Sequence, residues 1–187
     1  PGEWTDREYR RYSTESGPVS PRLVPGTAPG QVVVADSDEH TEEGHITESA
    51  EMRIRMTEKR MGKMKMLAGE MEEPLYEGPG KPETVLVGWG SMEGPLLEAR
   101  DILGQKGYPV GVLVFGDLYP LPVRTLFRLR EMNADFVGVE QNATGQLARL
   151  IRQETGIAMS GSILRFDGRQ MCGQEIAERW LKEVKEQ

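Results

Sequence analysis

The sequence predicts an α/β protein built as a three-layer, doubly wound parallel sheet, preceded by an extended arm and a long helix. In the second half of the chain, four short apolar runs alternate with four segments of helical periodicity. The apolar runs are nearly continuous, as in strands that are covered on both faces. Strands that alternate with helices in this way build parallel sheets through right-handed crossovers.

The expected strands cover residues 84–88, 109–115, 136–140 and 162–166. The expected helices cover residues 96–106, 123–132, 144–155 and 174–185. In the second of these helices Leu126, Phe127 and Leu129 are expected to face the core. Together these elements define an α/β domain over residues 79–187.

Residues 1–48 are expected to form an extended interface arm. Five prolines and four glycines in the first 30 residues exclude a long helix or a central strand there. A disordered tail is the alternative, but the aromatic residues Trp4, Tyr9 and Tyr12 favour an arm that wraps a partner. The apolar run at residues 31–35 is expected as a short strand.

Both histidines of the chain, His40 and His45, lie among carboxylates in residues 36–48. Such residues can bind a divalent metal. Their spacing matches no specific metal motif, and the glycine of a calcium-binding EF-hand loop is missing. A solvated or interfacial loop is therefore favoured, and no metal ligand is assigned.

Residues 49–78 are expected to hold a long helix, to about residue 72, and the start of a linker that runs on to residue 82. Thr47 or Ser49 can cap the helix start through a side-chain oxygen. The helix is rich in methionine and basic in its middle. Binding to a calmodulin-like partner, binding to a membrane surface and packing against another subunit are all open, and subunit packing is favoured.

The composition excludes several classes of function. The chain has 187 residues and a formal net charge of −7, which argues against nucleic acid or an anionic membrane as the main partner. The single cysteine, Cys172, cannot form an internal disulfide or hold an iron–sulfur cluster, and it is expected to pack at the start of the last helix. A reducing, cytoplasmic compartment is expected, with no membrane span.

A candidate site follows the third strand. A parallel sheet places ligands at the carboxyl ends of its strands, which is where Glu140, Asn142, Thr144 and Gln146 fall. Asn142 or Thr144 can cap the helix that follows, and Gly156 is expected to end it.

A second candidate is the turn after the first strand, which contains Gly90 and Ser91. Its glycine spacing resembles a dinucleotide fingerprint only loosely, and Glu93 would repel a phosphate, so a structural turn is favoured. The chain has no nucleophile elbow and no Walker lysine. Taken alone, the residues predict a fold and two candidate loops but no reaction.

Several runs resemble the alpha subunit of 2-oxoacid:ferredoxin oxidoreductases, nearest to the 2-oxoglutarate enzymes. They occur in the family's order and cover nearly the whole chain; the main ones are residues 20–22, 36–40, 44–48, 86–91, 119–122, 139–147 and 167–169. In that family the region from residue 79 onward is similar to the C-terminal domain of transketolase. The resemblance identifies the chain as the C-terminal part of an alpha subunit.

The resemblance also implies an activity for the whole enzyme. Family members convert a 2-oxoacid and coenzyme A to acyl-CoA and CO2, using thiamine diphosphate, Mg²⁺ and iron–sulfur clusters that reduce ferredoxin. The cofactor motifs belong to other domains or subunits, so this chain alone is expected to be inactive. It is expected to supply subunit assembly and an edge of the active site, and no catalytic residue is assigned.

The implied partners are a thiamine-diphosphate-binding beta subunit, a second copy of the alpha subunit, ferredoxin and coenzyme A. Within the family pattern, Arg22 is expected to reach a carboxylate of the substrate or of a partner side chain, because a guanidinium pairs bidentately with carboxylates. A backbone contact of Arg22 that fixes the arm is the alternative. A transketolase-like or dehydrogenase beta-type fragment and a stand-alone interaction module also remain open.

Overall fold

The computed structural model describes residues 8–185. Trp4, which was expected to belong to the arm, lies outside the described residues. The chain divides into two compact units, Pro1–Glu70 and Met71–Gln187.

The unit Met71–Gln187 is built on a five-stranded sheet with the order β1-β3-β2-β4-β5. Its strands are β1 (Leu75–Glu77), β2 (Thr84–Trp89), β3 (Gly111–Phe115), β4 (Asp135–Glu140) and β5 (Gly161–Leu164). The four predicted strands pair in parallel, as expected. The fifth, β1, pairs antiparallel with β3 at the edge of the sheet, within the segment that was expected to be a linker.

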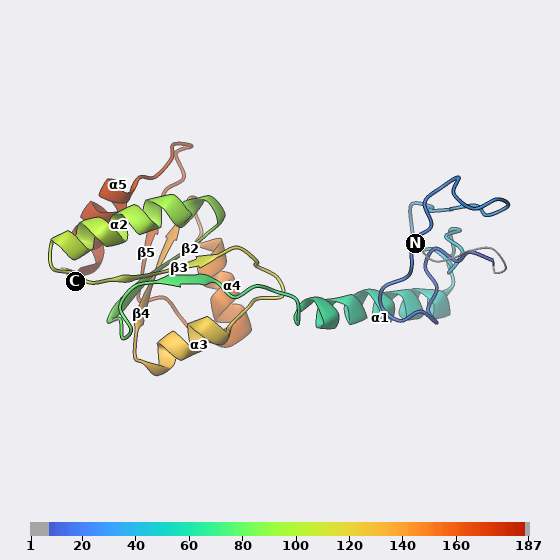
Figure 1. Cartoon of the computed structure of the whole chain (residues 1–187), viewed down its shortest axis with the longest axis horizontal. Coiled ribbons are helices and arrows are strands. Elements are labelled where there is room, and N and C mark those ends of the chain that lie inside the picture. The colour runs from blue at the N-terminus through green and yellow to red at the C-terminus, as the bar shows by residue number, and fades with distance from the viewer. Residues whose placement is uncertain (1–7, 186–187) are drawn as a thin grey trace. The chain divides into compact units, whose positions relative to one another are not determined.

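Helices cover both faces of this sheet, which confirms the three-layer architecture (Figure 1). One face packs against α2 (Glu93–Gln105) and α5 (Gly173–Trp180), and the other against α3 (Arg124–Glu131) and α4 (Gln146–Thr155). A short 3₁₀ helix, η1 (Gly90–Met92), leads into α2, and a π-helical segment, η2 (Leu181–Lys185), extends α5. Helix α2 begins three residues earlier than predicted, because a proline is tolerated in the first helical turn, where Pro95 lies.

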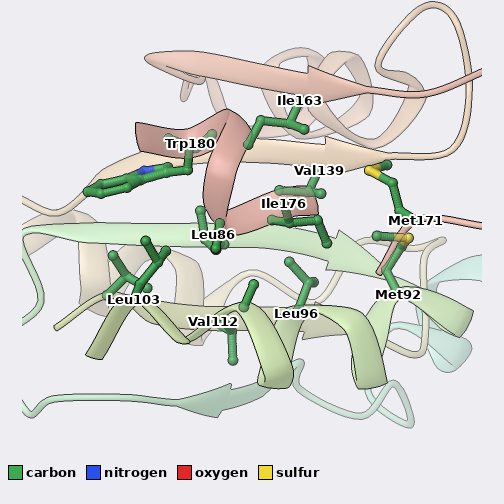
Figure 2. Close-up of a cluster of buried hydrophobic side chains, with 14 of the residues drawn as sticks. Leu86, Met92, Leu96, Leu103, Val112, Val139, Ile163, Met171, Ile176 and Trp180 are labelled. Atoms are coloured by element: carbon green, nitrogen blue, oxygen red, sulfur yellow. The ribbon is translucent and has the colours of Figure 1, made fainter. Parts of the chain in front are cut away.

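The core has two layers because successive strand residues point to opposite faces of the sheet. Figure 2 shows the layer under α2 and α5, where Leu86, Val139 and Ile163 of the sheet meet Leu96 and Ile176 of the helices. The second layer consists of Val85, Val87, Leu113, Phe115, Leu126, Leu129, Ala134, Phe136, Leu147, Ile151 and Ile157. Each fully buried aliphatic side chain stabilises the fold by about 1.5–3 kcal/mol.

Two side chains of this unit do not pack as predicted. Phe127 is exposed, because it lies about 100° around α3 from Leu126 and so leaves the buried face. Cys172 takes the N-cap position of α5, where a helix start was expected, but its side chain is exposed rather than packed.

The unit Pro1–Glu70 contains the long helix α1 (Ala50–Leu67), which ends about one turn earlier than predicted. The Ser49 hydroxyl accepts a hydrogen bond from the Met52 N–H at 3.2 Å and caps the helix, which confirms one of the two predicted caps. The predicted strand at residues 31–35 is wrong: the structure forms no strand over this run, and Val32 is 72% exposed.

Candidate functional site

The sheet has a topological switch point between β2 and β4. From β2 the chain crosses to β3 on one side and then to β4 and β5 on the other. Ligands of open α/β sheets bind where the carboxyl ends of such strands diverge. The structure places residues 89–92 and 140–146 there, and these are called the switch-point loops below. They contain all the predicted site residues except Arg22.

Glu140 organises the second loop from inside the protein. Its side chain is buried, with only 1% of the residue exposed. The carboxylate accepts hydrogen bonds from Asn142 Nδ2 at 2.8 Å, Leu147 N at 2.9 Å, Ala148 N at 3.1 Å and Trp89 Nε1 at 3.3 Å. All four partners are donors, and two of them are free N–H groups of the first turn of α4. Glu140 therefore acts as an internal cap of α4, where the helix dipole favours a negative charge.

Asn142 folds the loop over this carboxylate. Its Oδ1 accepts hydrogen bonds from Thr144 N at 3.0 Å and Gln146 N at 3.2 Å. Of the two predicted caps, Asn142 therefore binds a free N–H group at the start of α4, beside those bound by Glu140, and Thr144 does not. Gly145 has a φ of +62°, a conformation that favours glycine, and from there the chain enters α4. Gly156 ends the helix in the left-handed conformation, as predicted.

The switch-point loops leave a set of polar groups at the surface. Ser91, Thr144 and Gln146 are exposed, and Gly90 has a φ of +54° at the start of η1. These groups, rather than the buried Glu140, are available to a ligand or partner. Their role in binding stays a prediction.

Ion pairs hold the loop that follows β5. Arg165 contacts Asp167 at 2.9 Å and also pairs with Glu175, and Arg169 contacts Asp167 from the other side. The hydrogen bonds from Arg165 and then Arg169 hold the pKa of Asp167 well below its usual range. Gln141 ties this loop to the switch point, since its Oε1 accepts from Met171 N at 2.9 Å. Sequence reasoning missed this network; residues 167–169 were noted only as part of the resemblance.

In the other unit, Glu42 is the buried carboxylate that joins the arm to α1. The residue is 6% exposed and binds Arg55 Nη2 at 3.0 Å, Arg10 Nη1 at 3.2 Å and the Thr14 hydroxyl. Burial raises the pKa of Glu42, but the hydrogen bonds from Thr14 and Arg10 outweigh burial and leave the pKa below its ordinary value. Loss of this carboxylate would remove a buried partner from two arginines at once.

Further contacts hold the arm on the same helix. Glu39 forms a bidentate pair with Arg60 at 2.8 and 3.1 Å. The rings of Tyr12 and His40 stack with 3.7 Å between their centroids. The expected arm therefore has a defined conformation over its described residues, built on ion pairs and ring stacking.

A hollow of about 410 Å³ lies beside this network, lined by Thr14, Gly17, Pro18, Arg55, Glu58 and Lys59. Burial, followed by the nearby charge of Lys63, lowers the pKa of Lys59. Arg22 does not line this hollow. It is exposed and forms no hydrogen bond or ion pair with any residue in the range 8–185.

Within the described range no cluster of three or more His, Cys, Asp or Glu side chains is suited to hold a metal ion. The carboxylates around His40 and His45 are instead used in local contacts, such as the hydrogen bond from Ile46 N to Asp36 at 2.7 Å. No helix of residues 8–185 combines the length and the apolar character needed to cross a membrane.

No protein-family model matches the chain. A 2-oxoacid:ferredoxin oxidoreductase 2 alpha subunit from Aeropyrum pernix is 34% identical to it over 173 residues, which is 91% of this chain and 26% of that protein. An alpha subunit of 2-oxoacid:ferredoxin oxidoreductase 1 from Sulfurisphaera tokodaii is 31% identical over 185 residues, or 97% of this chain and 28% of that protein. The chain thus spans about a quarter of the length of these curated relatives.

A solved structure agrees with these relatives. The 2-oxoglutarate:ferredoxin oxidoreductase from Magnetococcus marinus, with 2-oxoglutarate, coenzyme A and succinyl-CoA bound, matches with a TM-score of 0.80 and 27% identity. The match covers 96% of this chain and 31% of that chain. Over nearly its whole length, this chain is therefore a homologue of the alpha subunits of 2-oxoacid:ferredoxin oxidoreductases.

Proposed function

We propose that this chain is the C-terminal part of the alpha subunit of a 2-oxoacid:ferredoxin oxidoreductase, with Met71–Gln187 as its transketolase C-terminal-like domain. The observation that supports this most strongly is the TM-score of 0.80 with the Magnetococcus marinus enzyme over 96% of the chain. Such coverage includes residues of both units, so it extends beyond a common α/β domain.

The whole enzyme converts a 2-oxoacid, coenzyme A and two oxidised ferredoxins to acyl-CoA, CO2, two reduced ferredoxins and a proton. We propose 2-oxoglutarate as the 2-oxoacid and succinyl-CoA as the product. The support is that the solved enzyme that matches the chain holds 2-oxoglutarate, coenzyme A and succinyl-CoA. The curated relatives are named for 2-oxoacids in general.

The cofactors of this reaction belong to other parts of the enzyme in this proposal. An iron–sulfur cluster needs several thiolates, usually four, and this chain offers only the single, exposed Cys172. The donor set therefore does not fit a cluster. Thiamine diphosphate and Mg²⁺ are assigned to a partner beta subunit and to the rest of the alpha subunit, and the chain by itself is inactive.

In this proposal the chain contributes contacts for subunit assembly and one edge of the active site of the whole enzyme. Ile54 and Met61 are exposed apolar side chains that lie on one side of α1. We assign them to contact with the beta subunit or with a second alpha subunit. The switch-point loops supply polar groups on a rigid base, and Arg22 remains free to meet a carboxylate of the substrate or of a partner.

The test is to purify the tagged protein from its native cell and identify every co-purifying chain by mass spectrometry. Recovery of a thiamine-diphosphate-binding beta subunit, and of peptides that precede Pro1, is the expected result. The preparation is then assayed for CoA-dependent reduction of ferredoxin with 2-oxoglutarate, pyruvate and 2-oxobutyrate. Faster turnover of another 2-oxoacid would overturn the substrate, and recovery of the chain alone would overturn the assigned function.

A further inference from the structure

Two adjoining hollows lie at the edge of the sheet where the parallel strands begin, opposite the switch-point loops. The larger has a volume of about 470 Å³ and the smaller about 340 Å³. Thr84, Trp180 and Lys185 line both hollows, so the two are neighbours. Their size lies in the range of pockets that hold small organic molecules.

Trp180 has a buried donor at this place. The residue is 3% exposed, and its indole Nε1 forms no hydrogen bond with any described residue. Native proteins rarely leave such a group unpaired. The indole of Trp89, by contrast, donates to Glu140. Figure 2 shows Trp180 at the end of the core cluster that lies opposite Met92 and Met171.

The segment after Trp180 can give access to this donor. Residues Leu181–Lys185 form a π-helical turn, a rare conformation that occurs frequently at functional sites. This turn contributes Lys185 to both hollows and Val184 to the smaller one. The indole N–H itself is fully buried in this structure, so a ligand can reach it only if this neighbouring segment moves.

The charges around the larger hollow favour an anion. Lys81 and Lys185 line it, and Glu83 is its one carboxylate. Neither lysine forms an ion pair with a residue in the range 8–185. The smaller hollow adds Asp135 and Glu183, of which Glu183 is already paired with Arg179 at 2.9 Å.

The larger hollow also has an aromatic wall. The ring of Tyr108 meets that of Trp180 edge-on, with 5.6 Å between centroids, and Lys185 Nζ lies 6.0 Å from the Tyr108 ring centroid. A ligand with an apolar body and a negatively charged group could therefore contact the aromatic rings and a lysine at the same time.

We propose that the larger hollow is a binding site for a small organic carboxylate with an apolar body. The indole N–H of Trp180 donates to a carboxylate oxygen, Lys81 and Lys185 balance its charge, and the ring of Tyr108 packs against the apolar body. The site is built from residues of Met71–Gln187 alone and does not depend on the proposed reaction.

The test observes the indole N–H directly in the full 187-residue chain, labelled with ¹⁵N. The three tryptophans give three indole cross-peaks in a two-dimensional NMR spectrum, and W180F identifies that of Trp180. If W180F does not fold, W4F and W89F identify it by elimination. Titration with benzoate is expected to move the Trp180 peak downfield in a saturable way and to leave the Trp89 peak in place.

Matched ligands and variants decide the outcome. Benzyl alcohol and benzylamine should not move the peak. K81A and K185A should each weaken benzoate binding about three- to five-fold, as expected for a partly exposed ion pair, whereas K106A, outside the lining, should not. The proposal would be overturned by any of three results: an unmoved Trp180 peak, equal binding of benzyl alcohol and benzoate, or full benzoate affinity in both lysine variants. The indole N–H would then be expected to bind water.

Discussion

The indole Nε1 of Trp89 donates to the buried carboxylate of Glu140 across 3.3 Å, and this bond joins the carboxyl ends of β2 and β4 at the switch point. The two residues are 51 positions apart in sequence. The same carboxylate oxygen accepts from Leu147 N, at the start of α4. One carboxylate thus holds two strand ends and one helix start in a fixed arrangement.

E140Q tests this arrangement. The glutamine amide would present two N–H groups to a site that contains only donors, so at least one buried donor loses its acceptor. We expect a loss of about 2–3 kcal/mol in the free energy of unfolding, measured by urea denaturation with circular dichroism. W89F removes one donor of four and should cost about 1 kcal/mol. Equal stability of E140Q and the unchanged chain would contradict this account of Glu140.

The location of this site could be predicted from the sequence, but the hydrogen bonds inside it could not. The apolar run ending at Glu140 marks a buried strand, and the fold class then puts residues 140–146 at the carboxyl edge. Glu140 was expected to be available to a ligand together with its neighbours. In its inward orientation Glu140 also accepts a hydrogen bond from Trp89, which belongs to a different strand, and no local pattern encodes that pairing.

The errors in the fold have similar causes. Strand β1 has three residues between Pro74 and Gly78, too few to show any periodicity, and it exists because β3 offers an edge. The run at residues 31–35 has the composition of a strand but is not part of the sheet that the described residues form. A strand depends on a partner, so apolar composition alone predicted one strand too many and missed another.

G145A isolates the backbone contribution to the same loop. A Cβ at this position would meet its nearest atom, Glu140 Oε1, at 3.6 Å, so the cost comes from the positive φ rather than from a clash. We expect a loss of about 1–2 kcal/mol in the free energy of unfolding, measured by urea denaturation.

G104A is the matched control for G145A. Gly104 lies in α2 with open space around it and without a positive φ, so the same change should be neutral or stabilise the fold by up to about 1 kcal/mol. A destabilisation of the same size in both variants would show that the left-handed conformation of Gly145 is not the cause.

The pKa of Glu42 predicts how the arm responds to acid. Because its folded-state pKa lies below the ordinary value, the ionised carboxylate stabilises Pro1–Glu70 at every pH above the unfolded-state pKa, about 4.3. This contribution is lost as the pH falls through the folded-state pKa. The contribution of Glu42 should therefore be constant between pH 7 and 5 and should fall below about pH 4.

An NMR titration of the side-chain carboxyl carbons measures this directly. The midpoint of Glu42 should lie below the ordinary value of a glutamate side chain, about 4.3. E42Q should remove the step below pH 5 in the chemical shifts of Tyr12, and E58Q, which changes an exposed glutamate of α1, should leave it in place. A midpoint for Glu42 at or above about 4.3 would show that burial outweighs the hydrogen bonds from Thr14 and Arg10.

The exposed face of α1 gives the last prediction, which rests on the proposed assembly. Ile54 and Met61 are seven residues apart and so lie on one side of the helix. I54E and M61E should each reduce the amount of partner subunit recovered with the tagged chain at least several-fold. The melting temperature of the isolated chain should not change, because neither side chain is buried within it.

Met66 supplies the matched control, since it is an exposed methionine of the same helix about 140° around the axis from Met61. M66E makes the same chemical change on a different side, so it should leave co-purification intact. Equal loss in M61E and M66E would point to a general effect of added negative charge on this basic helix. Unchanged recovery in all three variants would mean that the side of α1 carrying Ile54 and Met61 is not the surface on which the subunits meet.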